Sequence, residues 1–109
     1  MLTISLENKW VDAARLFGDV ERVVTEALQA YLVEQCQQRI DQAASKIAAY
    51  SQKYSSDYNT FKQSVQTDED FLARIEAQHP LWEEDAMEWE YWLEEHQAWQ
   101  RRLETILSD

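Results

Sequence analysis

The segment from Leu2 to Glu7 alternates apolar with polar residues, and no other part of the chain does so. A period of two is typical of a strand with one buried face. A single strand leaves backbone N–H and C=O groups without partners in its own chain, and a second copy across a two-fold axis supplies them. The pattern therefore predicts one short strand that pairs across a homodimer.

The next part of the chain follows a helical period instead. A short helical segment from Asn8 to Phe17 leads to apolar residues spaced three and four apart from Val20 to Tyr50, with no Gly or Pro between them. This spacing predicts one helix from about Asp19 to Tyr54. At 1.5 Å per residue, such a helix is on the order of 50 Å long. Its distal half therefore needs another segment to cover it.

The second half of the chain contains further helical patterns that provide this cover. A short helix is expected over residues 56–65, and Thr67 is expected to cap a second helix that ends before His79-Pro80. Tryptophans at helical spacing predict a last helix from about Leu81 to Leu107. The last helix is expected to pack antiparallel along residues 40–54.

Aromatic and aliphatic residues of the two shorter helices are expected to close the far end of this helical hairpin. They are Phe61, Phe71 and Leu72.

Residues 18–32 read Gly-Asp-Val-Glu-Arg-Val-Val-Thr-Glu-Ala-Leu-Gln-Ala-Tyr-Leu. Together with the preceding strand pattern, this run resembles the glycine turn and second helix of the ribbon-helix-helix family. Members of that family are small dimeric DNA-binding proteins, and many of them are antitoxins of toxin–antitoxin pairs. The resemblance implies a mainly α protein. It would have a ribbon-helix-helix module with an extended second helix over residues 1–50. The helical patterns described above add a long helical hairpin, with an acidic, Trp-rich helical extension over residues 51–109.

The family's architecture also implies roles for individual residues. The dimer core would comprise Leu2, Ile4, Leu6, Val23, Leu28 and Leu32. Contacts with DNA would come from Thr3, Ser5, Lys9, Asp19 and Val20. Short hydroxyl side chains on the ribbon replace the usual Arg, Lys, Gln or Asn, and few cations are available for phosphate. Operator binding by the protein alone is therefore expected to be weak.

Charge divides the chain at about residue 62. The part through Lys62 holds 7 Lys and Arg against 8 Asp and Glu, whereas the part from Gln63 holds 3 against 13, a balance of −10. Residues 53–61 and 81–90 are similar to C-terminal extensions of some prokaryotic antitoxin-like proteins. The resemblance and the charge predict binding of a small basic toxin. The expected contact residues are Trp82, Glu83, Glu84, Trp89 and Trp92.

The same residues also allow a structural interpretation. The tryptophans would then form the packed stripe of a helix, and the glutamates would form its solvated face. Both interpretations stay open at the level of the sequence, since Trp concentrates binding energy in interfaces but also fills cores.

Enzymatic and metal chemistry find little support in the sequence. His79 and His96 lack metal-ligand spacing, and no phosphate loop, nucleophile elbow or paired Cys and His is present. No cofactor is expected, and Cys36 is expected to be a small core residue. No apolar run of the chain is long enough to span a membrane, and the pattern at its N-terminus is not the one expected of a secretion signal. A cytoplasmic location is therefore expected.

These observations lead to one function and one alternative. The first is the antitoxin of a prokaryotic type II toxin–antitoxin pair, with repression of its own operon as an added role. The alternative is an acidic dimeric helical scaffold that binds proteins and not DNA.

Overall fold

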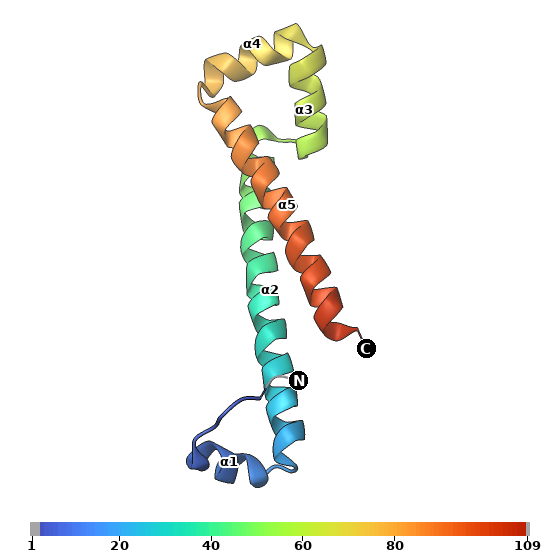
Figure 1. Ribbon diagram of the computed structural model, residues 1–109. Coiled ribbons are helices and arrows are strands. Elements are labelled where there is room, and N and C mark those ends of the chain that lie inside the picture. Colours follow the sequence, from blue (N-terminus) through green and yellow to red (C-terminus); the bar gives the residue numbers. More distant parts are fainter. Residues whose placement is uncertain (1–2, 109) are drawn as a thin grey trace.

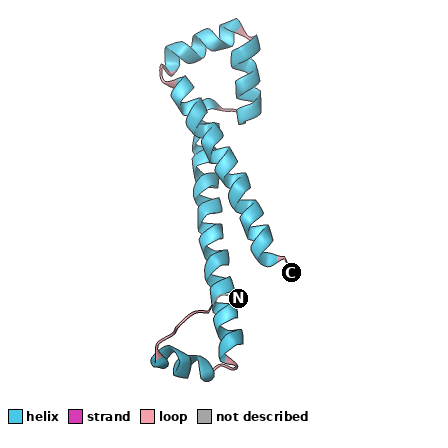
Figure 2. Ribbon diagram, in the orientation of Figure 1, coloured by secondary structure: helices cyan, strands magenta, loops and turns pink. Residues whose placement is uncertain are grey.

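The computed structural model describes residues 3–108, and this part of the chain is helical with short connections and contains no strand (Figures 1 and 2). Its principal extents are 68 × 25 × 20 Å. The helices are α1 (Asn8–Arg15), α2 (Val20–Tyr54), α3 (Tyr58–Thr67), α4 (Glu69–Gln78) and α5 (Trp82–Leu107).

The predicted N-terminal strand is wrong. Residues 3–7 form neither strand nor helix, and Leu2 lies outside the described residues. The Glu7 carbonyl accepts hydrogen bonds from the N–H groups of Trp10 and Val11, so the backbone turns directly into α1. Alternating residues can form a strand only where another strand pairs with their backbone groups, and none does here.

The absence of a strand also overturns the fold class built on it. A ribbon-helix-helix fold requires a β-strand, so the resemblance of residues 18–32 does not extend to the architecture. Its glycine turn and helix start are nevertheless present. Gly18 has a φ of 143°, and the Asp19 carboxylate accepts a hydrogen bond from the Arg22 N–H at 3.2 Å. This capping explains where α2 begins.

The helical hairpin predicted from periodicity is confirmed. Helix α5 runs back antiparallel along the distal half of α2, and the two helices diverge towards the C-terminal end of α5 (Figure 1). Ala43 on α2 is fully buried. Because an alanine side chain is a single methyl group, two helix backbones can approach closely at this point.

Local capping sets the boundaries of the two short helices. Asp57 caps α3 by accepting from the Thr60 N–H at 2.9 Å. Asp68 caps α4 by accepting from the N–H groups of Asp70 and Phe71. The prediction that Thr67 caps this helix is therefore wrong by one residue. Thr67 is the last residue of α3, and its hydroxyl donates to the Gln63 carbonyl.

The main hydrophobic core lies at the distal end of the hairpin, where α3 and α4 meet α2 and α5 (Figure 1). Its buried residues are Tyr54, Phe61, Ile75 and Trp89. Phe71 packs partly buried against this cluster, which confirms the predicted closure of this end by Phe61 and Phe71. Leu72 is half-buried. The distal end is therefore a compact aromatic core, and the other end of α2 has no comparable cover.

Candidate interaction surfaces

The N-terminal end of the molecule exposes an unusual number of apolar side chains. We define the proximal arm as residues 3–32, which comprise the segment before α1, α1 itself and the start of α2. The exposed large apolar residues of the arm are Ile4, Leu6, Trp10, Leu16, Phe17, Leu28, Tyr31 and Leu32. Their exposed fractions range from 38% to 82%. A concentration of this kind typically marks an interaction surface.

The total accessible surface supports the same conclusion. The chain exposes 8564 Å², whereas a compact monomer of 12.9 kDa is expected to expose roughly 6,300 Å². The excess of roughly 2,300 Å² is as large as the area that one protomer buries in an obligate dimer. Much of the surface of this elongated chain is therefore available to a partner.

The residues predicted to form a dimer core are mostly uncovered in the single chain. Ile4, Leu6, Leu28 and Leu32 are exposed, and Val23 is half-buried. They all lie on the proximal arm, but residues 3–7 do not form the strand that was expected to pack them into a dimer core. Leu2, the sixth predicted residue, lies outside the described residues.

The residues predicted to contact DNA are not brought together on paired strands. Thr3 and Ser5 are exposed in an irregular segment, and the Lys9 ammonium lies 4.7 Å from the centroid of the Trp10 ring. Asp19 caps α2, and Val20 is half-buried. A carboxylate at the start of α2 repels phosphate, so this helix start is a poor anion site.

The predicted partner-binding residues of α5 separate into three environments. Trp89 is fully buried in the distal core, Trp82 and Trp92 are half-buried, and Glu83 and Glu84 are exposed in the first turn of α5. Acidic residues at this position stabilise the helix through its dipole. Trp89 thus contributes to packing, and Glu83 and Glu84 are open to solvent.

A set of tyrosine–carboxylate hydrogen bonds joins α5 to α2 and α3. The Tyr50 hydroxyl donates to Glu88, and the Tyr54 hydroxyl donates to Asp85 at 2.6 Å. The Lys53 ammonium also contacts Asp85, at 2.6 Å. In a third pair, Tyr58 donates to Glu90 at 3.0 Å. Part of the acidic face of α5 therefore holds the hairpin together.

These hydrogen bonds were not predicted from the sequence, although part of their arrangement has a local signal. Tyr50 and Tyr54 are four residues apart near the end of α2, which places their side chains on the same side of that helix, whereas Tyr58 is the first residue of α3. The carboxylates that accept hydrogen bonds from these hydroxyls lie on α5, so they become evident only when the register of α5 against α2 is known.

The environment of these groups shifts their ionisation. Burial raises the pKa of Tyr50 and of Tyr58 to about 12, and hydrogen bonds to Glu88 and Glu90 act in the same direction. Burial and the hydrogen bond to Asp85 likewise raise the pKa of Tyr54. Burial alone would raise the pKa of Asp85, but hydrogen bonds from Lys53 and Tyr54 outweigh it, so this pKa is lowered.

We expect these shifts to make the fold sensitive to alkali. A tyrosine with a raised pKa stabilises the fold fully below about pH 10, its unfolded pKa, and this stabilisation is lost as the pH rises towards the folded pKa. The free energy of unfolding, measured with denaturant, should therefore fall between pH 10 and pH 12. Tyr58→Phe should reduce the slope of the free energy of unfolding against pH, because one group that releases its proton more readily in the unfolded state is removed. Equal slopes for the two proteins would contradict the prediction.

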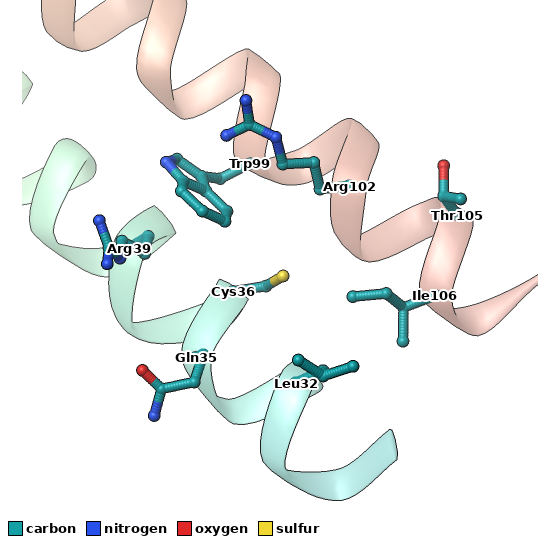
Figure 3. A pocket seen from close by; sticks show the side chains of 8 residues that line it. All are labelled: Leu32, Gln35, Cys36, Arg39, Trp99, Arg102, Thr105 and Ile106. Carbon is teal, nitrogen blue, oxygen red and sulfur yellow. The ribbon is translucent and has the colours of Figure 1, made fainter. Parts of the chain in front are cut away.

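A groove lies between α2 and α5 where the two helices diverge (Figure 3). It has a volume of about 550 Å³ and is lined by Leu32, Gln35, Cys36, Arg39, Trp99, Arg102, Thr105 and Ile106. Cys36 is buried, as predicted for a small core residue. The Trp99 indole N–H donates to Glu95 at 2.9 Å, which fixes the ring beside the groove.

Two basic side chains accompany this tryptophan. The guanidinium carbons of Arg39 and Arg102 lie 5.0 Å and 4.3 Å from the centroid of the Trp99 ring. Both distances are within the range of cation–π attraction. The groove therefore combines apolar walls with two cations in a strongly acidic chain.

Among the described residues, no group of three or more His, Cys, Asp or Glu side chains is placed to hold a metal ion. No helix of residues 3–108 is both long enough and apolar enough to cross a membrane. The features that stand out are the proximal arm and the groove, which are suited to binding other molecules. They are the basis for a functional proposal, because comparison with models of protein families, with curated proteins and with solved structures finds no match.

Proposed function

We propose that this chain is a protein-binding module that acts as a homodimer and self-associates through its proximal arm. The observation that carries the proposal is the apolar surface of the arm, which nothing in the described chain covers. Burial of apolar area is the main driving force for stable association. A second copy is a suitable partner because symmetric self-association is the commonest form of protein assembly.

The distribution of charge supports contact at the arm. Residues 3–32 hold three Lys and Arg against five Asp and Glu, so two arms repel each other only slightly. Residues 63–109 carry a balance of −10 and would repel a second copy strongly. A dimer joined at the arms keeps the acidic ends apart.

The test is a charge substitution on the arm. The variant Leu28→Glu with Tyr31→Glu alters two residues of α2 that are 51% and 58% exposed, so the helix should persist. Association would remove the two introduced carboxylates from water, and the free-energy cost of this desolvation should prevent dimer formation. We expect light scattering at micromolar concentration to show a dimer for the unmodified chain and a monomer for the variant, with unchanged circular dichroism.

Met87→Glu is the control, because Met87 is an exposed apolar residue of α5 outside the arm. It should leave the dimer intact. A folded monomer of the unmodified chain, or equal dissociation by Met87→Glu, would refute self-association through the arm.

The antitoxin role drew on the ribbon-helix-helix resemblance, and it stays a prediction with no support from the fold. The exposed Glu83 and Glu84 and the balance of −10 are the features that would serve it. The test is whether this chain rescues cells that express the protein encoded by the neighbouring reading frame. If the variant Glu83→Lys with Glu84→Lys rescues the cells as well as the unmodified chain does, the acidic start of α5 is not the toxin-binding surface.

A further inference from the structure

We propose that the groove between α2 and α5 binds an amphipathic helix of a partner protein whose acidic side chains pair with Arg39 and Arg102. The groove shares Leu32 with the proximal arm, but its other lining residues lie outside the arm, and the proposal does not require the arm to form a dimer.

The shape and lining of the groove fit a helix. Leu32, Cys36 and Ile106 provide apolar contacts, and Trp99 lies at the other end of the groove (Figure 3). Leu32 and Arg39 are seven residues apart on α2, which corresponds to about 10 Å, or two helical turns. A partner helix presents apolar residues at i, i+3, i+4 and i+7 over the same length. The groove thus has room for one such stripe.

The charge of the groove defines the partner. Within residues 3–108, neither Arg39 nor Arg102 forms an ion pair with a carboxylate within 4.0 Å, whereas Arg15, Arg22 and Lys53 each do. Glu95 lines the adjoining hollow with both arginines, and its carboxylate accepts the hydrogen bond from Trp99. Guanidinium groups bind carboxylates through paired, charge-assisted hydrogen bonds. A ligand with Glu or Asp beside its apolar stripe would therefore satisfy both arginines.

The composition of the groove favours a protein over a small amphiphile. Tryptophan and arginine are the residue types that most often dominate the energy of protein interfaces. A site for a small ligand usually encloses most of the ligand's surface. This groove is open along its side because α2 and α5 diverge (Figure 1), and an open groove suits a helix that keeps its polar face in solvent.

The experiment uses the full chain and two labelled model peptides. One is a helical peptide with Leu at i, i+3, i+4 and i+7 and Glu at the flanking positions, and the other has Lys in place of every Glu. We expect fluorescence anisotropy to show saturable binding of the Glu peptide, at least tenfold tighter than that of the Lys peptide. The variant Arg39→Glu with Arg102→Glu should reverse this preference.

The matched control is Arg74→Glu with Arg101→Glu, which changes the net charge equally but alters exposed residues that do not line the groove. This control should keep the preference for the Glu peptide. The proposal is overturned if the Glu peptide does not bind saturably, if both peptides bind equally, or if the control abolishes binding as fully as the groove variant.

Light scattering separates this inference from the proposed self-association. Dissociation of a dimer by Arg39→Glu with Arg102→Glu would show that a second copy occupies the groove and would overturn the proposal. If the unmodified chain is a monomer that still binds the Glu peptide with the expected preference, the groove proposal stands and the proposed dimer fails.

Discussion

Trp89→Ala should lower the free energy of unfolding by about 3–5 kcal/mol, the range for removing a large aromatic side chain from a core. Trp89 is fully buried, and its ring lies within 6.0 Å of the rings of Tyr50, Tyr54, Tyr58 and Phe61. Removal of the indole would leave a cavity between α2, α3 and α5. Denaturant unfolding monitored by circular dichroism measures the change.

Trp89→Phe separates ring packing from polar effects. The Trp89 indole nitrogen has no hydrogen-bond partner, so Phe loses volume but no hydrogen bond, and we expect a smaller cost of about 1–2 kcal/mol. Met87→Ala, at an exposed position of α5 outside the proximal arm, should change the free energy by only about 0.5 kcal/mol. If Trp89→Ala were no more costly than Met87→Ala, the distal core would not be the main source of stability.

The second large effect is expected where α2 and α5 approach each other. Ala43→Leu should destabilise the fold by about 1–3 kcal/mol, because three extra carbon atoms do not fit at a fully buried position. The new side chain would force the helices apart. Denaturant unfolding gives the energy, and faster amide hydrogen exchange in α5 would show the separation.

Ala44→Leu is the matched control, because Ala44 is the adjacent residue of α2 and is exposed. Leu and Ala are both good helix formers, so this substitution should change stability by no more than about 0.5 kcal/mol. Equal effects at positions 43 and 44 would contradict the close packing of α2 against α5.

The long helices could be predicted from the sequence with little error. The expected bounds of about 19–54 and 81–107 compare with Val20–Tyr54 and Trp82–Leu107 in the structure. Helix hydrogen bonds join residues four apart, and helix ends depend on nearby side chains such as Asp19. Both kinds of information are local, so periodicity and capping were sufficient.

The predicted strand failed because its stability is not local. Residues 2–7 have the alternation of a strand, but a strand exists only when another one supplies hydrogen bonds. Alternation indicates which side chains could share one face of a strand, but it does not indicate whether a second strand is present to pair with it. The predicted DNA contacts of Thr3 and Ser5 failed for the same reason, because they required paired strands.

The sequence by itself determined the helices, the acidic second half and the lack of a recognisable catalytic motif. Only the tertiary structure decided that Trp89 fills the core and that Trp99 lies beside the groove. There Trp99 of α5 contacts Arg39 of α2, which precedes it by 60 residues in the sequence. The physical reason is that such contacts depend on the rotation and register of α5 against α2. Those quantities arise from the packing of many side chains together, whereas helix formation depends on neighbours within a few residues.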